Sequence, residues 1–267
     1  MRTALTIAGS DSGGGAGIQA DLKTFAAHGV FGTSAITAVT AQNTVGVSAW
    51  QALPADLVTA QIEAVAGDIG ADAVKTGMLA NAAIVEAVAA AIESLDLPLV
   101  VVDPVMVAKG GDRLLEEEAI AGMRSELLPR AHVVTPNIPE AEVIAGMAIR
   151  STDDMRRAGD RILALGPRIV LVKGGHLDSA DVVDVVCTRD GAYELRSPRI
   201  QGTATHGTGC TLAAAIAANL ALGSGDRDAI AAARTYLQGA MQHAPAIGRG
   251  HGPLNHFWRA VYSKDGA

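Results

Sequence analysis

Residues 4–29 read ALTIA, then GSDSGGGAG, then IQADLKTFAAH, and end at Gly29. The apolar run Ala4–Ala8 predicts a first strand, and Gly9–Gly17 is a glycine-rich loop. Ile18–His28 predicts a helix that Gly29 ends. This order of elements predicts a ligand-binding loop at the carboxyl edge of a sheet. The glycine spacing fits neither the G-x-G-x-x-G pattern nor a Walker loop, so this stretch alone does not name the ligand.

Outward from this stretch, strands and helices alternate as far as about residue 175. Such alternation predicts an α/β fold, a three-layer, doubly wound and mostly parallel sheet with helices on both faces. Asp190-Gly191 between two apolar runs predicts a β-hairpin in the C-terminal third. We find no linker and no repeat, and we therefore expect a single domain over 1–267. The further strands are expected at 33–39, 47–52, 73–76, 99–102, 132–135 and 169–172, and the further helices at 54–69, 81–95, 114–127, 151–165 and 226–244.

Composition excludes several classes of function. The net charge of the 267-residue chain is −7 and no arginine run is present. A nucleic-acid or anionic-membrane partner is therefore disfavoured. Two cysteines, Cys187 and Cys210, make no disulfide framework and indicate a reducing compartment. Without a signal-peptide pattern or an apolar run of membrane-spanning length, we expect a cytoplasmic protein.

A second glycine turn, THGTGCT at residues 205–211, runs into an alanine- and leucine-rich helix. Unpaired N–H groups at the start of a helix make an anion site, here at Gly207, Thr208, Gly209 and Cys210. The same turn has a plainer interpretation, in which the glycines only close a loop and Cys210 is a small core residue. The turn by itself leaves both open.

Polar groups follow most of the predicted strands. In a doubly wound sheet these groups meet at one edge, where ligands bind. The set suits phosphoryl transfer, which needs an anion cradle, a divalent ion and positioning of the acceptor. Oxygen ligands for Mg²⁺ would come from Asp103, Asn137 and Glu140, and Lys173 would meet nucleotide phosphate. The set is Asp11, Gln42, Asn43, Asp103, Asn137, Glu140, Lys173 and the Thr208–Cys210 turn.

Six motifs together resemble the hydroxymethylpyrimidine/phosphomethylpyrimidine kinases of thiamin synthesis, in the ribokinase-like superfamily. The resemblance is colinear and covers nearly the whole chain. It implies ATP-dependent phosphorylation of 4-amino-5-hydroxymethyl-2-methylpyrimidine to its monophosphate and then to the diphosphate, with ATP and Mg²⁺ as cofactors, by a homodimer. The motifs are GSDSGGGAGIQADLKTF (9–25), AVTAQNTVGV (38–47), KTGMLA (75–80), DPVMVAKGGD (103–112), TPNIPE (135–140) and THGTGCTL (205–212).

The resemblance assigns roles residue by residue. Gln42 would hydrogen-bond the aminopyrimidine, with Gly9, Asp21, Met78 and Val105 lining the same pocket. Asn137 and Glu140 match the superfamily's N-x-x-E metal motif, and Thr208, Gly209 and Cys210 match its anion hole. Lys109, in a glycine-flanked loop, is our separate hypothesis for the phosphate of the monophosphate substrate.

Cys210 stands where the sugar kinases of this superfamily carry an aspartate base. A thiol at a helix N-terminus is expected to have a lowered pKa. Cys210 would then take the hydroxyl proton, or only help to shape the anion hole.

Three alternatives compete with this interpretation. Pyridoxal kinase uses the same scaffold, and pyridoxal as a comparison substrate distinguishes it. A hydrolase with Cys210 as nucleophile needs an oriented histidine base, for which His206 is near in sequence. A non-catalytic binder would not need Asp103, Asn137, Glu140 and the glycine turn.

Overall fold

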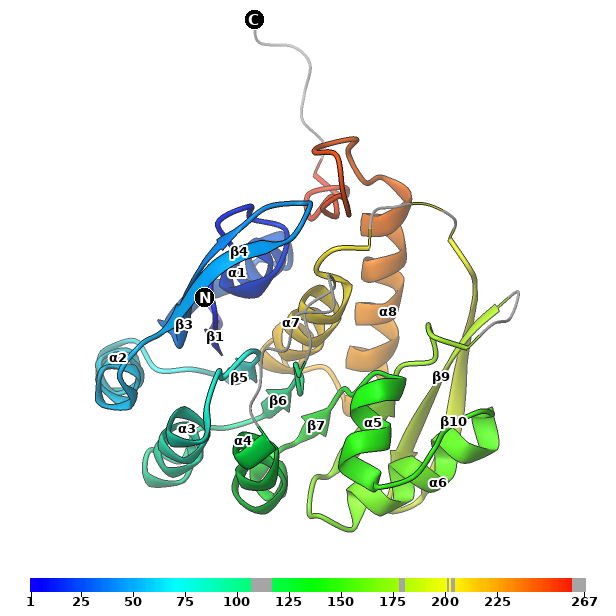
Figure 1. Cartoon of the computed structure of the whole chain (residues 1–267), viewed down its shortest axis with the longest axis horizontal. Helices are drawn as coiled ribbons and strands as arrows, with labels where there is room; N and C mark the ends of the chain where they lie inside the picture. The colour runs from blue at the N-terminus through cyan, green and yellow to red at the C-terminus, as the bar shows by residue number, and fades with distance from the viewer. Residues whose placement is uncertain (107–116, 178–180, 201, 203–204, 261–267) are drawn as a thin grey trace, which may run out of the picture.

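The computed structural model describes residues 1–106, 117–177, 181–200, 202 and 205–260. An eight-stranded sheet forms the centre, in the order β10-β9-β8-β7-β6-β5-β1-β2 (Figure 1). Neighbouring strands from β2 to β8 run parallel, and β9 and β10 form the predicted antiparallel hairpin. The strands are β1 (Thr3–Ala8), β2 (Phe31–Ile36), β5 (Ala73–Thr76), β6 (Val100–Val102), β7 (Val133–Val134), β8 (Ile169–Val172), β9 (Asp181–Thr188) and β10 (Gly191–Pro198).

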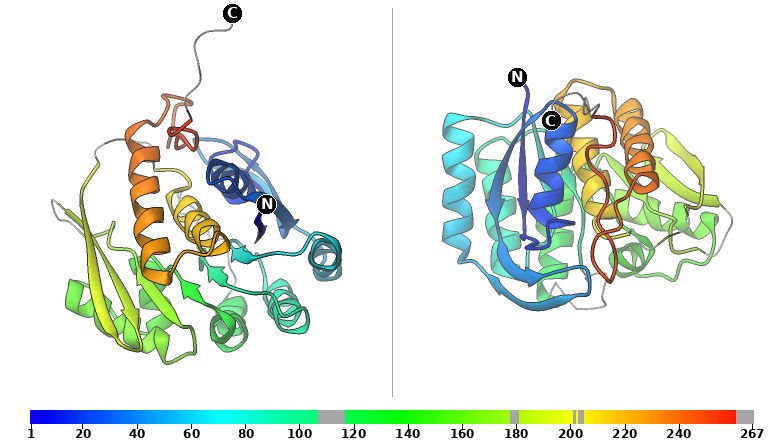
Figure 2. Two further views of the ribbon diagram at one scale, coloured as in Figure 1. Left: turned by 180° about the vertical axis from the view of Figure 1, so that it is seen from behind. Right: turned by 90° about the horizontal axis from the view of Figure 1, so that it is seen from above.

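Helices cover both faces of the sheet, so the predicted three-layer α/β class is confirmed (Figure 2). One face packs against α1 (Gly17–Ala27), α7 (Thr208–Ala221) and α8 (Asp226–Gln242). Among the described residues, no helix is both long and apolar enough to span a bilayer. The other face carries α2 (Ala55–Asp68), α3 (Ala82–Ser94), α4 (Glu117–Gly122) with the π turn Met123–Leu127 and the 3-10 turn Leu128–Arg130, α5 (Ile138–Ala145) and α6 (Thr152–Leu163).

The α7 helix explains the unusual run of small apolar residues after Cys210. It packs on the sheet and lies between α1 and α8, and nearly every residue from Thr211 to Ala221 is buried. A helix buried on all sides must be apolar all round. Alanine side chains let α1 and α8 approach it closely. The predicted buried helix is therefore confirmed, and its first turn is held rigidly at the carboxyl edge of the sheet.

The strand predicted at 33–39 is in fact two strands. β2 ends at Ile36, and β3 (Ala38–Gln42) pairs with β4 (Val47–Ala52) in a separate two-stranded sheet. Thr37 makes the break, because its N–H donates to the Ala8 carbonyl (3.0 Å) and its hydroxyl donates to the Met78 carbonyl (2.6 Å). These bonds fix Thr37 beyond the end of β1. Gln42 is therefore the last residue of a hairpin strand, and the turn of the hairpin begins at Asn43.

The C-terminal strap, residues 248–258, joins parts of the molecule that are distant in sequence. Figure 2 shows it passing between the β3–β4 hairpin and α8. His251 N–H donates to the Thr44 carbonyl (2.8 Å), and His206 N–H donates to the Gly252 carbonyl (3.3 Å). Further along, the Tyr236 hydroxyl donates a hydrogen bond to the His256 carbonyl (2.6 Å). The strap thus ties the hairpin and the second glycine turn to α8.

His256 makes this strap sensitive to acid. Its side chain is buried against Thr211, and burial, aided by Lys23, lowers the pKa of His256 from 6.5 to about 4. Between these two values the unfolded chain holds more protons, so the free energy of unfolding should fall by roughly 3 kcal/mol as the pH drops from 6.5 to 4. Urea unfolding of His256→Gln should show a flatter pH slope. His251→Gln, on the exposed part of the strap, should keep the wild-type slope, and equal slopes in wild type and His256→Gln would contradict the assignment.

Candidate active site

A cavity of about 690 Å³ opens at the carboxyl edge of the sheet. It brings together nearly all of the residues that the sequence singled out. Asp21 does not line it, Lys109 lies outside the described residues, and Asn43 instead uses its side-chain oxygen to accept the Val45 N–H (2.8 Å). The predicted residues that line the cavity are Gly9, Asp11, Gln42, Met78, Asp103, Val105, Asn137, Glu140, Lys173, Gly207, Thr208, Gly209 and Cys210.

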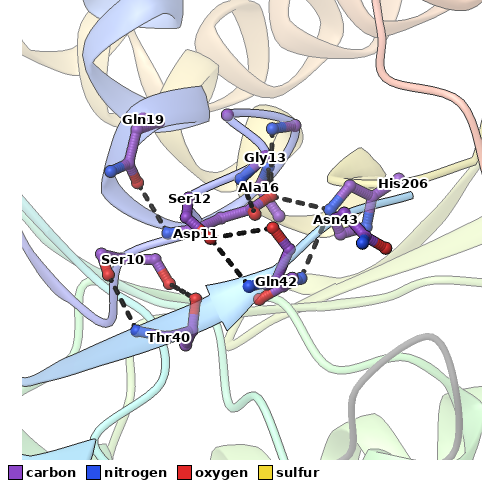
Figure 3. A network of polar contacts seen from close by, with 12 residues as sticks. Ser10, Asp11, Ser12, Gly13, Ala16, Gln19, Thr40, Gln42, Asn43 and His206 are labelled. Carbon is purple, nitrogen blue, oxygen red and sulfur yellow. Dashed lines mark hydrogen bonds and ion pairs between the residues drawn. The ribbon is translucent and has the colours of Figure 1, made fainter. Parts of the chain in front are cut away.

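The first glycine loop is wrapped around the carboxylate of Asp11 (Figure 3). One oxygen accepts the N–H of Gly13 (2.8 Å), and the other accepts those of Gly15 (3.0 Å) and Ala16 (2.8 Å). The second oxygen also lies 2.8 Å from His206 Nε2. Burial by itself would raise the pKa of Asp11, but these hydrogen bonds outweigh burial and hold it below its usual range. A buried, ionised carboxylate therefore shapes this loop.

The second glycine turn opens α7 as predicted. Gly207 adopts a left-handed conformation (φ 79°), and a Cβ there would lie 1.9 Å from the Gly15 carbonyl oxygen. Only glycine fits this position. A Cβ on Gly209 would lie 3.2 Å from Asp103 Oδ2 and 3.3 Å from Lys173 Nζ. The first N–H groups of α7 therefore lie beside the charged pair Asp103–Lys173. Such N–H groups at a helix start can bind an anion.

Asp103 and Lys173 form that pair across two strand ends. Lys173 Nζ lies 2.9 Å from Asp103 Oδ1, and the Thr135 hydroxyl donates to the same oxygen (3.2 Å). Burial opposes the charge of Lys173, but Asp103 and Glu140 outweigh burial and raise the pKa of Lys173 above its usual value. Lys173 is thus a cation at the cavity wall, suited to a phosphate group.

Asn137 and Glu140 form a capping box at the start of α5. The Asn137 side-chain oxygen accepts the Glu140 N–H (2.9 Å), and Glu140 Oε2 accepts the Asn137 N–H (2.8 Å). Burial raises the pKa of Glu140 to about 7, with Lys173 opposing and Asp103 adding to the rise. A nearby cation would stabilise the ionised form of this carboxylate.

These donors suit a magnesium ion. Within the described residues no cluster of three or more acidic, histidine or cysteine side chains could enclose a metal ion. Mg²⁺, however, is commonly bound by one or two carboxylates together with substrate phosphates and water. Asp103 and Glu140 supply two carboxylates, while the Asn137 oxygen is already engaged in the cap.

Asp21 lies behind the cavity instead of in its wall, which corrects the expectation that it lines the substrate pocket. Its carboxylate is fully buried, lies 2.7 Å from Lys75 Nζ and accepts the Thr6 hydroxyl (2.7 Å). Burial alone would lower the pKa of Lys75, but the Asp21 carboxylate outweighs burial and raises it. Lys75 itself lines the cavity. The motif that contains Lys75 carried no signal of an ion pair, because its partner is 54 residues away.

The Cys210 thiol does not behave as its place at a helix N-terminus suggests. Burial, together with Asp21 and Asp103, raises the pKa of Cys210 to about 11, although Lys75 and the Gly17 N–H oppose the rise. The expectation of a lowered pKa was therefore wrong. Near neutral pH the group is a thiol, which disfavours a cysteine-nucleophile hydrolase. His206 turns its Nε2 atom to Asp11 Oδ2 (2.8 Å) and not to Cys210.

The sequence did not predict a second buried ion pair, between Asp184 and Arg234. Asp184 Oδ2 lies 2.8 Å from Arg234 Nε, and its other oxygen accepts the Gly174 N–H (2.8 Å). Both side chains line the cavity. An aspartate within the apolar run VVDVV of β9 is the signal that would have located it. The pair fixes the backbone that follows Lys173.

Comparisons with known proteins agree with this geometry. The phosphomethylpyrimidine kinase family model matches residues 11–255. The hydroxymethylpyrimidine/phosphomethylpyrimidine kinase of Bacillus subtilis is 48% identical over 95% of this chain and 94% of its own. The Escherichia coli kinase of the same name is 46% identical over 95% and 97%. The bifunctional thiamine biosynthesis protein ThiED of Geobacter sulfurreducens is 50% identical, and this chain spans 53% of its length.

Solved structures share the fold. Phosphomethylpyrimidine kinase from Clostridium difficile superposes with a TM-score of 0.81 at 45% identity, over 90% of this chain and 100% of that one. An ADP complex of Bacillus subtilis pyridoxal kinase gives a TM-score of 0.89 at 39% identity, over 96% and 97%. The family match at residues 11–255 runs from within the first glycine loop to beyond the second glycine turn. The chain therefore belongs to the phosphomethylpyrimidine kinase family and is a phosphotransferase.

Proposed function

We propose that this protein transfers phosphate from ATP to the hydroxymethyl group of 4-amino-5-hydroxymethyl-2-methylpyrimidine, and then to the resulting monophosphate, in thiamine biosynthesis. One observation carries the proposal. A single cavity joins an amide and apolar wall, with Gln42, Met78 and Val105, to the anion turn and Lys173. The first wall suits an aminopyrimidine, and the second suits the phosphates of a nucleotide. The names of the relatives point to the same substrates.

The roles follow from chemistry. Gln42 would pair with the amino group and ring nitrogen, so a ring without that edge would leave a polar group unpaired. The first N–H groups of α7 and the Lys173 cation would receive the transferred phosphoryl group. Asp103 and Glu140 would hold Mg²⁺, which neutralises phosphate charge when bound. The transition state of such transfers is loose, so the hydroxyl proton can leave late, and the thiolate form of Cys210 would be the group that takes it.

Product analysis tests the proposal. Purified protein with Mg²⁺ and ATP should convert the pyrimidine alcohol to its mono- and diphosphate. Folded protein that yields neither product would refute it. Pyridoxal belongs in the same assay, because the pyridoxal kinase neighbours make a pyridoxal kinase the second candidate. A higher kcat/KM for pyridoxal than for the pyrimidine alcohol would favour that candidate.

Replacing Gln42 by alanine should raise the KM for the pyrimidine alcohol about tenfold or more, because one or two hydrogen bonds are lost. The KM for ATP should stay within about twofold of wild type, the scatter expected for changes away from a site. Steady-state kinetics with each substrate varied in turn provides the measurement. Gln51→Ala, on the exposed face of the same hairpin, is the matched control. Equal changes in both KM values would place Gln42 outside the pyrimidine subsite.

The assembly and location are proposals as well. Apolar side chains are exposed on β2, on the hairpin and on α2, among them Phe31, Val39, Trp50 and Leu57. We propose that a second copy of the chain covers them, and light scattering should then give twice the 27.2 kDa chain mass.

Both cysteines are free thiols, which agrees with a cytoplasmic location.

A further inference from the structure

We propose that Asp11 and His206 are positioning residues that determine which end of the Gln42 amide faces the pyrimidine. The inference rests on the proposed function and concerns how the site recognises that substrate. Figure 3 shows the three side chains together at the cavity, contributed by the first glycine loop, the β3–β4 hairpin and the second glycine turn. Their juxtaposition joins residues 195 positions apart.

The starting point is the state of the Asp11 carboxylate. Its side chain is 1% exposed, and its Oδ2 atom receives hydrogen bonds from Gly15 and Ala16 as well as from His206. An ionised carboxylate has no proton and only accepts hydrogen bonds. The ring nitrogen of His206 that faces it, Nε2, must therefore carry the proton. This holds for the neutral ring and for the charged ring alike.

The proton on Nε2 constrains Gln42. The structure places the amide nitrogen of Gln42 3.4 Å from the same Nε2 atom. A nitrogen that donates to Asp11 cannot accept a hydrogen bond from an amide NH₂ group. The amide oxygen and nitrogen have nearly the same shape, and their assignment follows from the partners. The arrangement free of donor–donor repulsion turns Gln42 Oε1 toward His206.

In this orientation one edge of the Gln42 amide can pair with the substrate. An amide oxygen has two lone pairs, and the NH₂ group has two N–H bonds. With one lone pair turned toward His206, the other lone pair and one N–H bond remain side by side. They match the amino group and the adjacent ring nitrogen of a 4-aminopyrimidine, as donor to acceptor and acceptor to donor. His206 thus selects the amide orientation that can read this edge.

The backbone around Gln42 is already fixed, so the side chain is the part left to orient. Gln42 N–H donates to Ser12 Oγ (2.7 Å), and the Ser12 hydroxyl donates to the Gln42 carbonyl (2.8 Å). His206 is equally confined, because a Cβ on Gly15 would lie 2.5 Å from its Cδ2 atom. A fixed donor beside a fixed backbone limits the amide to one of two orientations.

Kinetics of three His206 variants tests the proposal. His206→Leu removes the donor and should raise the KM for the pyrimidine alcohol about tenfold, as expected for one hydrogen bond to a buried group. Its KM for ATP should stay within about twofold, which is the usual scatter for remote changes. His206→Gln can place an N–H near the position of Nε2 and should recover most of the affinity. His206→Asn is too short to do so and should resemble leucine. The unfolding midpoint of each variant separates these effects from loss of the fold.

A double-variant cycle shows whether His206 acts through Gln42. In a Gln42→Ala background, His206→Leu should change the KM for the pyrimidine by less than about twofold, because coupled residues are not additive. An equal increase in both backgrounds would overturn the proposal, as would equal effects on both substrates. Wild-type protein that forms no pyrimidine phosphate would refute the proposed function itself. Product formation with an unchanged His206→Leu variant would refute the positioning role alone.

Discussion

Replacing Lys75 by methionine should lower the free energy of unfolding by about 3–5 kcal/mol, the usual cost of leaving one partner of a buried ion pair uncompensated. Both side chains of the Lys75–Asp21 pair are fully buried. Lys75 binds Asp21 Oδ2, and Asp21 Oδ1 has no hydrogen-bond partner among the described residues. Without Lys75 the Asp21 carboxylate must stay charged in an apolar setting or take up a proton. Urea unfolding followed by circular dichroism measures the loss.

Two controls make this result specific. Adding Asp21→Asn to Lys75→Met removes the unpaired charge and should restore most of the lost stability. Arg2→Met breaks the Arg2–Asp72 pair, in which the arginine side chain is 60% exposed, and should cost at most about 1 kcal/mol. A Lys75→Met variant as stable as Arg2→Met would show that the buried pair does not hold β1, α1 and β5 together.

Replacing Cys210 by alanine should lower kcat by about 10²-fold or more, the contribution typical of a group that moves a proton in the transition state. The KM for ATP should change by less than about threefold, because the backbone N–H groups of the turn remain. Since the pKa of Cys210 is raised to about 11, the thiolate is scarce at neutral pH. Only the thiolate can take the hydroxyl proton, so the kcat of wild type should rise with pH between about 6.5 and 9 without levelling off.

The second cysteine supplies the matched control. Cys187 lies buried in β9 against α6, where a Cβ on Gly159 would come within 2.4 Å of its sulfur. Cys187→Ala should leave kcat within about twofold of wild type, as expected for a change away from the site. Unchanged turnover in Cys210→Ala would remove Cys210 from proton transfer and leave it only a role in shaping the anion hole.

Sequence patterns predicted the parallel sheet well, because its strands are short apolar runs between clear helix signals. β6 and β8 are wholly buried, as their β-branched composition indicates. The division at Thr37 was not predictable in the same way. No glycine or proline marks it, and two long-range hydrogen bonds to Ala8 and Met78 make it.

Predictions for the candidate site succeeded or failed for similar reasons. Residues that end strands or begin helices were placed correctly at the cavity, because their position follows from local structure. Asp21 was misplaced because its direction depends on Lys75, a partner from another strand. The ionisation of Cys210 was mispredicted because burial near Asp21 and Asp103 outweighs the helix terminus. Properties set by distant partners and by local dielectric are not encoded in a short motif.

The meeting of the two glycine loops has a consequence for how the protein is made. Asp11 emerges early from the ribosome, whereas His206, which completes its hydrogen bonds, follows 195 residues later. At translation rates of about 5–20 residues per second, the first loop waits about 10–40 s for its partner. A nascent chain that stops before Gly207 contains every strand of the sheet but lacks the anion turn, α7 and α8, and the last two cover one face of the sheet. The anion site therefore cannot form before the C-terminal part of the chain that carries α7 has been synthesised.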